Sequence, residues 1–535
     1  MKNNAKGFLL ILTLVFVAII VIFFQYMCCV PINLHYAPFV LELLIVAIVV
    51  LFLLGGLVNL PAKGKKFKIT TSIVLLTSIL VLFFFAMVLG SPATLGLNNY
   101  RNQSVIKEVD FSTIEEFDPN QVQLVDKNTA VQLGDRVFGT LGSDEVSQYD
   151  VGDDWVQIVL NDSLYRVTPI DFGGLAKYFV TRTTPGYIMV DCENGDAKLI
   201  RTEGLRYMTS AYFNDNLERH LFLTDPTAIF GQPKFELDDS QKPYWVTPVY
   251  KVTWVSKTKD VKGIYITDPV SGKSEYYDKE AAPKWVDNIY PVSLVYTQFQ
   301  QTKRYENGLF NWSNKGVVEF TDDYAYVQFD NNVWIYTGVT SVGKDESNVG
   351  FAYVDLRNGE VSYIRRAGAE EYSARSSAEG AVQQYHYTAI FPSMVNVKGI
   401  PTYFMGLVDG ANLIKSYAFV SYENYQTVAV GSTVEEAYRN YLKLIGETEV
   451  PKQDEKVETA EKDFVVSEVR IIVQNGNSIV LLLDQQGQIY WYDLSNANFA
   501  ASFIHEGDSI TANVTDAGEI KDFIHIFPAE QTAEE

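Results

Sequence analysis

The hydrophobic pattern changes near residue 90. Before that point the chain holds three uninterrupted apolar runs, over 8–27, 40–60 and about 69–89. Each run has about the 20 residues that a helix needs to cross the hydrocarbon of a bilayer, and none carries a charge at its middle. A helix satisfies its own backbone hydrogen bonds, as a lipid-embedded segment must. We therefore predict that residues 1–90 form an anchor of three transmembrane helices.

The rest of the chain alternates apolar with polar residues over short stretches, and one such stretch occurs twice. From Asp153 the sequence reads DDWVQIVLNDSLYRVT, and 169 residues later, from Asp322, it reads DDYAYVQFDNNVWIYT. Later landmarks stay in step at offsets that fall to 158: Val190-Asp191 with Val354-Asp355, Ile229-Phe230 with Ile390-Phe391, and PYWV from Pro243 with PTYF from Pro401. A slowly falling offset is typical of a duplicated unit whose loops have shortened in one copy. We predict two tandem repeats, residues 150–302 and 303–446.

Each repeat is predicted to be a mainly antiparallel sheet with a few helices, an α+β fold. In the first repeat strands are expected over 155–160 and 164–168, and Asn194-Gly195 marks a hairpin. Helices are expected over 210–221 and near 283–289. In the second repeat the closing helix has a clearer start, because Ser432 and Thr433 stand three residues before Glu435 and Glu436 and can form a capping box. The apolar stripe of that helix comprises Val434, Ala437, Tyr438, Tyr441, Leu442 and Ile445.

Three further segments complete the predicted organisation. Residues 91–149 alternate only weakly and are interpreted as a membrane-proximal stalk or small subdomain, with short strands over 105–111, 122–125 and 130–137. Residues 447–462 are charged and poor in large apolar side chains, as a flexible linker is. Residues 463–530 hold five short apolar runs separated by glycine-containing turns, which predicts a small five-stranded β-barrel of OB-like shape.

One segment of the first repeat resembles a known family. The stretch KGIYITDPVSGKSEYYDKE, residues 262–280, is similar to the terminal hairpin of PepSY-like modules, in which a strand ending in Asp, a Pro-x-Ser/Thr-Gly turn and a second strand recur. The stretches that start at Gly186 and Gly350 are looser versions. PepSY-like domains are small α+β units of secreted and membrane-anchored bacterial proteins, some of them thought to regulate proteases. The resemblance thus implies a protein of the bacterial cell envelope.

Charge predicts how the chain is oriented in a membrane. Residues 1–90 carry six Lys and one acid, Glu42; because the whole chain has a net charge of −22, the remaining residues carry −27. Lys2 and Lys6 precede the first apolar run and four more lysines lie between the second and third, whereas residues 28–36 contain no Lys or Arg. The positive-inside rule then places the N-terminus in the cytoplasm and everything after residue 90 outside. We predict a multi-pass protein of the cell membrane with a large extracytoplasmic region, whose acidic surface disfavours nucleic acid.

Residues able to carry chemistry are few. Cys28 and Cys29 end the first apolar run, and Cys192 is flanked by Asp191 and Glu193, whose charges disfavour a thiolate, so a Cys192–His220 pair is a poor candidate nucleophile and base. No two of the five histidines have metal-ligand spacing. The acid pairs that precede the repeated strands are Asp153-Asp154 and Asp322-Asp323. They could bind a cation, but we favour their interpretation as turn formers. Several aromatic residues in predicted strands could line a ligand groove, but we favour their placement in the hydrophobic core. They are Trp155, Tyr165, Tyr244, Trp245, Trp285, Trp312 and Trp334.

The sequence therefore predicts no catalytic, cofactor-binding or metal-binding residue. The favoured interpretation is a membrane-anchored, extracytoplasmic binding, scaffold or regulatory protein of the bacterial envelope, without catalytic activity and with a protein partner. The alternative is an envelope enzyme, or a module that inhibits or regulates proteases, acting on peptides or glycans. A cleft in which polar groups from different elements converge would distinguish the two. The sequence leaves the partner, the oligomeric state and the role of the acidic surface open.

Overall fold

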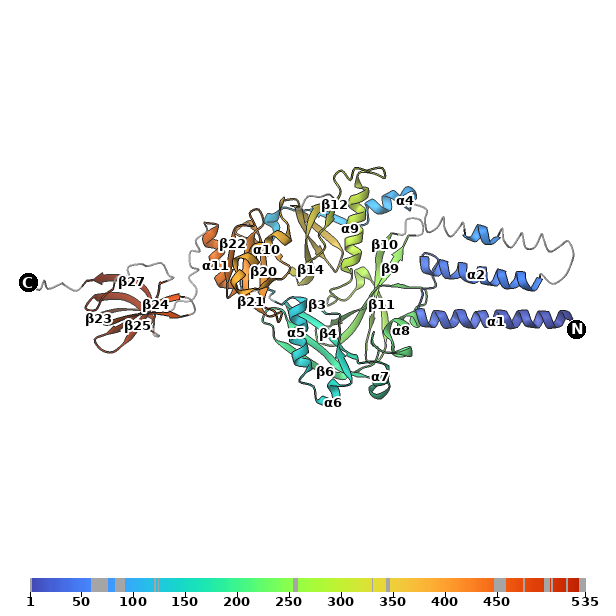
Figure 1. Cartoon of the computed structure of the whole chain (residues 1–535), viewed down its shortest axis with the longest axis horizontal. Coiled ribbons are helices and arrows are strands. Elements are labelled where there is room, and N and C mark those ends of the chain that lie inside the picture. Colours follow the sequence, from blue (N-terminus) through green and yellow to red (C-terminus); the bar gives the residue numbers. More distant parts are fainter. Residues whose placement is uncertain are drawn as a thin grey trace, which may run out of the picture. The chain divides into compact units, whose positions relative to one another are not determined.

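The structure, a computed structural model, shows two compact units, Met1–Glu447 and Thr448–Glu535, each described here by itself (Figure 1). It describes residues 2–58, 76–81, 92–119, 122–123, 125–253, 258–329, 331–342, 347–446, 459–474, 477–494, 501, 504–515 and 518–528. Most of the described elements are strands, arranged in several separate sheets.

The N-terminal region corrects the predicted anchor of three transmembrane helices. Helix α1 (Lys2–Cys28) contains one stretch long and apolar enough to cross a membrane, Ile11–Cys28. Helix α2 (Ala37–Val58) contributes a shorter apolar stretch, Ala37–Val50, and the third predicted span is helical over 76–81, with its remaining residues outside the described ones. Within the described residues the chain is therefore a β-rich protein with one helix able to span a bilayer. Hydropathy counts apolar residues, whereas a span also requires that they form one continuous helix.

The described part of residues 1–447 forms four sheets. Sheet 1A comprises β2 (Tyr149–Val151), β3 (Val156–Leu160), β4 (Ser163–Phe172), β5 (Thr184–Asp191) and β6 (Ala197–Leu205). Sheet 1B comprises β7 (Ile229–Phe230), β8 (Lys234–Leu237), β9 (Pro243–Val252), β10 (Lys259–Thr267) and β11 (Ser274–Asp278). Sheet 2A comprises β1 (Val105–Glu108), β12 (Val318–Phe320), β13 (Ala325–Phe329), β14 (Asn332–Ser341), β15 (Ser347–Asp355), β16 (Glu360–Ile364) and β17 (Gly368–Ala369). Sheet 2B comprises β18 (Thr388–Ala389), β19 (Ser393–Val397), β20 (Ile400–Val408), β21 (Ile414–Ser421) and β22 (Val428–Gly431).

Sheets 1A and 1B pair their strands in the same registers as sheets 2A and 2B. Tyr149 on β2 lies opposite Phe172 on β4, and Val318 on β12 lies opposite Ser341 on β14. The same equivalence relates the pairs Val156–Val167 and Ala325–Tyr336, Tyr165–Asp191 and Trp334–Asp355, and Pro243–Leu237 and Pro401–Asn396. One predicted landmark is displaced: β7 is Ile229–Phe230, but its counterpart β18 is Thr388–Ala389, so Ile390-Phe391 lie two residues further on.

The four sheets are joined in series by shared hydrophobic cores. Sheets 1A and 1B enclose a core with helix α8 (Leu217–Thr224), where Phe235 and Trp245 are buried. Sheets 1B and 2A share a second core with helix α9 (Val292–Glu306), and sheets 2A and 2B share a third with α10 (Glu371–Ala381). Burial of alternating strand residues on both faces supplies most of the driving force for this stacking.

Residues 92–149, expected as a stalk or subdomain, are instead spread over both repeats. Helix α4 (Pro92–Arg101) packs on α9, and β1 extends sheet 2A by pairing in parallel with β16. The segment predicted as a strand over 130–137 is helix α5 (Lys127–Phe138), which packs on sheet 1A. Asp126 caps this helix by accepting a hydrogen bond from the Thr129 amide at 2.9 Å. The remaining short helices are η1 (Phe111–Thr113), α6 (Ser143–Val146), α7 (Leu175–Thr181), η2 (Phe213–Asp215), η3 (Lys279–Ala281) and η4 (Gln383–Tyr385).

The predicted closing helices have different outcomes in the two repeats. Helix α11 (Val434–Leu444) is confirmed: Thr433 accepts a hydrogen bond from the Glu436 amide, and the Ser432 amide donates to the Glu436 carboxylate. In the first repeat the prediction over 283–289 is wrong, because that segment is a turn-rich connection and the helix is α9, which starts at Val292.

The described residues of the second unit form a five-stranded antiparallel sheet in the order β25-β24-β23-β26-β27. Its strands are β23 (Thr459–Gln474), β24 (Asn477–Asp484), β25 (Ile489–Asp493), β26 (Ser509–Thr515) and β27 (Ile520–Phe527). The edges meet where Trp491 and Glu519 form a parallel bridge. The predicted linker, 447–462, extends too far towards the C-terminus, because β23 already starts at Thr459, which pairs with Thr515. Residues 447–458 lie outside the described ones.

Candidate ligand-binding groove

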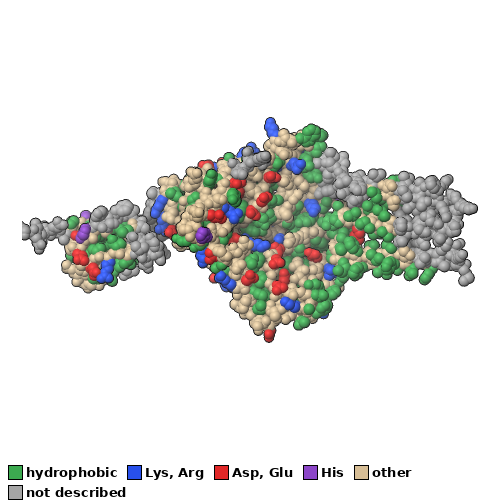
Figure 2. Space-filling view, viewed as in Figure 1, with side chains coloured by type: hydrophobic (Ala, Val, Ile, Leu, Met, Phe, Trp, Pro, Cys, Tyr) green, Lys and Arg blue, Asp and Glu red, His purple; other side chains and the backbone are tan. Residues whose placement is uncertain are grey.

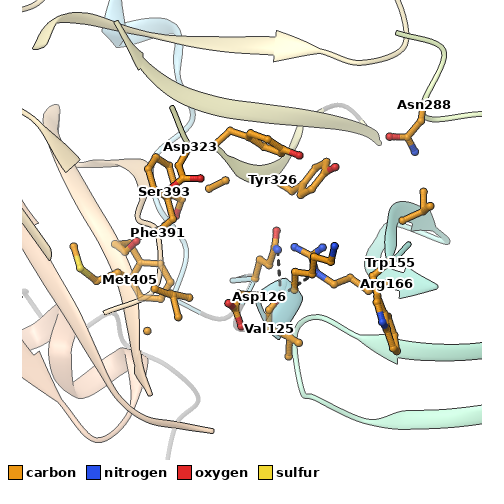
Figure 3. A pocket seen from close by; sticks show the side chains of 18 of the residues that line it. Val125, Asp126, Trp155, Arg166, Asn288, Asp323, Tyr326, Phe391, Ser393 and Met405 are labelled. Atoms are coloured by element: carbon orange, nitrogen blue, oxygen red, sulfur yellow. Dashed lines mark hydrogen bonds between the residues drawn. The ribbon is translucent and has the colours of Figure 1, made fainter. Parts of the chain in front are cut away.

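A cavity of about 340 Å³ opens between the two repeats and is lined by residues of all four sheets and of the segment before α5 (Figure 3). This volume lies at the lower end of the range typical of small-ligand sites, about 300 to 1,000 Å³. Trp155 forms one wall and is held there by α5, which approaches so closely that a Cβ on Gly134 would lie 2.5 Å from the Trp155 ring. Other apolar walls are Tyr324, Tyr326, Phe391, Phe404 and Met405.

The repeated acid pairs that precede β3 and β13 contribute to this cavity. Asp154 and its equivalent Asp323 both line it. The Asp154 carboxylate accepts hydrogen bonds from Lys234 Nζ at 2.9 and 3.2 Å. The sequence interpretation of these pairs as turn formers explains the bend before each strand but missed that one member of each pair, Asp154 and Asp323, lines the same cavity. Within the described residues no group of three or more His, Cys, Asp or Glu side chains is arranged to hold a metal ion.

Arg166 is the most unusual side chain of the cavity. It is only 4% exposed, and among the described residues no carboxylate lies within ion-pair distance of it. Its guanidinium lies 5.3 Å from the ring centre of Tyr326, and its Nε donates a long hydrogen bond of 3.5 Å to the Val125 carbonyl. Figure 3 shows Arg166 reaching into the cavity. A buried guanidinium without an acid partner is costly, because burial removes its water without replacing its counter-charge.

A second cavity, of about 450 Å³, continues from the first. Gln123, Tyr326, Ser393 and Phe404 line both, so the two cavities form one groove that follows β13. The Gln123 Oε1 atom is buried and has no hydrogen-bond partner. The charged residues of the second cavity are all acidic: Glu115, Glu116, Asp118, Asp162 and Glu193. The first cavity, by contrast, mixes Arg166, Lys127 and Lys234 with Asp126, Asp154 and Asp323, so the cationic side chains that line the groove all lie at its Arg166 end.

Strand β3 shows how the free edge of an equivalent strand is covered. In the two-residue hairpin β3–β4, Leu160 and Ser163 close the turn, so the backbone groups of Gln157 and Val159 point away from β4. The Val159 amide donates to Asp287 Oδ2 at 2.7 Å, and Asn288 Nδ2 donates to the Gln157 carbonyl at 3.0 Å. Two side chains from the connection before α9 thus satisfy the edge of β3.

Strand β13 has the same geometry without the same cover. Phe329 and Asn332 close its hairpin, so the backbone groups of Tyr326 and Gln328 point away from β14. No described residue forms a hydrogen bond with these backbone groups. The neighbouring edge of β19 is covered, because the Phe117 amide donates to the Asn396 carbonyl at 2.8 Å and the Tyr353 hydroxyl to the Met394 carbonyl at 2.9 Å. Among the described residues, the edge of β13 therefore lines the groove with backbone amides and carbonyls that have no hydrogen-bond partner.

Two buried carboxyl groups hold the connection that covers β3. Glu236 accepts hydrogen bonds from the backbone amides of Asp287 and Asn288 at 2.8 and 3.1 Å. Burial raises the pKa of Glu236 to about 7. Burial, reinforced by repulsion from Glu236, raises the pKa of Asp287 well above its usual value. Arg357 donates to the carbonyls of Ala282, Pro283, Lys284 and Val286 and so fixes the same connection.

The other residues singled out in the sequence lie outside the groove. Cys192 is fully buried, burial raises the pKa of its thiol to about 11, and its sulfur accepts a hydrogen bond from Gln157 Nε2 at 3.4 Å. His220 bonds to the Gly272 carbonyl at 2.7 Å, so the structure does not bring the two together. Trp155 and Trp245 are buried as predicted, whereas Trp312 is 86% exposed, which contradicts its assignment to the core.

Comparisons with known proteins leave the family open. No protein-family model matches the chain, and no curated protein matches it. Among solved structures, an ACO/RPE65 chimera aligns at 9% identity and a TM-score of 0.15 over 71% of this chain and 62% of its own length. An exo-β-1,3-galactanase from Phanerochaete chrysosporium with β-1,3-galactotriose aligns at 10% identity and a TM-score of 0.16 over 71% of each chain. At these scores neither match bears on fold or function. The segment that resembles PepSY modules forms the hairpin β10–β11, and its family assignment stays a prediction.

Proposed function

We propose that the protein is a membrane-anchored binding protein of the bacterial cell envelope, without catalytic activity, whose groove takes up a ligand that carries a carboxylate. The observation that carries the proposal is Arg166, a buried guanidinium that faces a cavity and lacks an acid partner among the described residues. A bound carboxylate would supply the missing counter-charge, and guanidinium geometry suits a planar, bidentate acceptor. The aromatic walls beside it offer apolar contact to the rest of the ligand.

The N-terminal helix and the lysines before its apolar stretch support the proposed location. Helix α1 exposes apolar side chains along its length, among them Phe8, Phe16 and Phe23, as a lipid-embedded helix does. Figure 2 shows hydrophobic side chains gathered over the described parts of α1 and α2, whereas acidic and basic side chains are interspersed over the sheets. Lys2 and Lys6 precede the apolar stretch of α1, which favours a cytoplasmic N-terminus and an extracytoplasmic β-rich region.

An in-cell crosslinking experiment tests this function. A photo-crosslinking residue replaces Tyr324, an exposed side chain that lines the cavity, in the full-length, membrane-anchored chain. Tyr385, 59% exposed and not a lining residue of the groove, provides the matched control position. We expect a discrete adduct from position 324 and none from 385, and at least a tenfold smaller yield when Arg166→Gln is added. An adduct that survives Arg166→Gln unchanged would contradict recognition through the guanidinium, and its absence from position 324 would contradict binding in the groove.

A further inference from the structure

The groove also indicates what kind of ligand it takes. We propose, resting on the binding function above, that the ligand is an extended polypeptide segment that adds to the free edge of β13 as an antiparallel strand and places its C-terminal carboxylate on Arg166. Strand addition to an exposed sheet edge is an established mode of peptide recognition, in which backbone hydrogen bonds give affinity and alternate side chains give selectivity.

The first argument is the state of the two equivalent edges. On β3 the outward-facing groups of Gln157 and Val159 are satisfied by Asn288 and Asp287 of the same chain. On β13 the equivalent groups belong to Tyr326 and Gln328, and no described residue satisfies them. Buried or half-buried backbone groups are rarely left unpaired in proteins. The protein thus fills one edge with its own chain and leaves the other, inside a groove, for a ligand.

The second argument is the spacing and direction of the groove. Tyr326 and Gln328 are two residues apart on one strand, so their free groups repeat at about 6.8 Å, the spacing of successive outward-facing residues in an added antiparallel strand. Ala325 lines the first cavity and Val327 to Phe329 line the second, so β13 runs away from Arg166. An antiparallel ligand strand therefore runs towards Arg166 and ends there with its carboxylate.

The third argument is charge. The end of the groove remote from Arg166 is lined by carboxylates, among them Glu116, Asp118 and Glu193. Glu116 already pairs with Lys398 at 2.5 Å, whereas Glu193 has no cationic side chain within ion-pair distance among the described residues. A peptide with a basic side chain about four residues before its C-terminus would match both ends of the groove. The charges thus favour a short, extended segment with a basic residue and a free carboxyl terminus. β-Branched residues at alternate positions suit an added strand.

Binding of defined peptides to the full chain in detergent micelles tests the proposal. The probe is a pool of N-acetylated pentapeptides of sequence Lys-Xaa-Val-Xaa-Val, in which Xaa is Val, Thr or Tyr, compared with the same pool as C-terminal amides. We expect the amides to bind about tenfold more weakly, because each loses the charge-assisted bond to Arg166. Methylation of single backbone nitrogens should weaken binding about tenfold at alternate positions, whose N–H groups face β13, and less than twofold at the positions between.

Two variants and one competing ligand class complete the design. Gln328→Pro removes the outward amide of the edge strand and should reduce affinity about tenfold, whereas Gln328→Thr keeps that amide and should change it less than twofold. If the free acids bind better than the amides but N-methylation shows no alternation, strand addition is wrong and carboxylate binding stands. If a uronic-acid oligosaccharide binds in an Arg166-dependent manner and the peptides do not, the polypeptide assignment is overturned. If no probe responds to Arg166→Gln, the proposed function itself is overturned.

Discussion

The hairpins β3–β4 and β13–β14 occupy equivalent places in the two repeats and pair in the same register, yet their free edges are treated differently. The edge of β3 is covered by Asp287 and Asn288, which Glu236 holds in place. The place equivalent to Glu236 in the second repeat is Val395, and no described residue covers β13. The repeats also differ at Arg166, which belongs to the first repeat, because the equivalent residue on β14 is the buried Ile335. The comparison suggests that one repeat serves as a framework while the other presents an edge.

The largest expected effect concerns the connection that covers β3. Arg357→Ala removes the donors that bind four backbone carbonyls of residues 282–286, and we expect it to lower the free energy of unfolding by about 3 kcal/mol. Arg365→Ala is the matched control, because Arg365 makes only an exposed ion pair with Glu108 and should cost less than about 1 kcal/mol. Urea denaturation followed by tryptophan fluorescence measures both. Equal effects would mean that the connection is not fixed by Arg357.

The second effect distinguishes the filled edge from the open one. Asp287→Ala leaves the Val159 amide buried without an acceptor and should cost about 1 to 3 kcal/mol. Gln328→Ala changes the equivalent position on β13 and should stay within about 0.5 kcal/mol. The same denaturation experiment compares them. A loss from Gln328→Ala as large as that from Asp287→Ala would show that the edge of β13 is structural after all.

The third effect is a pH dependence that belongs to the first repeat. The folded-state pKa of Glu236 is raised to about 7 by burial, so the folded chain binds this proton more tightly than the unfolded chain does. This contribution to stability is fully present below the unfolded pKa of about 4.3 and is lost as the pH rises through about 7. Asp287 shifts in the same direction. We therefore expect the melting temperature to rise as the pH falls from 8 to 5, and Glu236→Gln to flatten this dependence. An unchanged profile in Glu236→Gln would assign the dependence to other groups.

The smallest effect concerns Arg166. Arg166→Ile gives the first repeat the residue that the second repeat has at the equivalent position, and it removes a buried charge without an acid partner. We expect stability to be unchanged or higher by up to about 1 kcal/mol, while carboxylate binding is lost. Lys234→Met should instead destabilise, because it leaves Asp154 without its partner. A marked loss of stability in Arg166→Ile would show that the guanidinium is a structural element.

The sequence predicts the strand pattern better than it predicts the candidate site. The landmarks at Asp153 and Asp322 predict the equivalent hairpins, because alternation and two-residue turns set strand register locally. The prediction of a helix over 283–289 is wrong because the apolar residues of this connection are buried by tertiary contacts, which no local sequence pattern reveals. Residues 130–137 were predicted to be a strand, although Asp126 before them was an available signal of a helix N-terminus.

The groove was not predictable for a physical reason. Arg166 reads as an ordinary polar position in an alternating strand, and its burial depends on Tyr326, which lies 160 residues later in the chain. The exposed edge of β13 is a property of the backbone and is independent of side-chain type. One signal was available: a comparison of the two aligned repeats shows that Arg166 corresponds to Ile335, and Glu236 to Val395. Positions at which the two otherwise similar repeats differ would therefore have pointed to Arg166 and to Glu236.

Hydrogen exchange at single amides tests the central claim most directly, namely that β3 is covered and β13 is open. The amides of Val159 and Gln328 occupy equivalent outward-facing positions and are compared in the ligand-free, full-length chain by exchange with residue-level fragmentation. The account predicts that Val159 exchanges about 10- to 100-fold more slowly than Gln328, because Asp287 accepts its hydrogen bond. Equal protection of the two amides would contradict it.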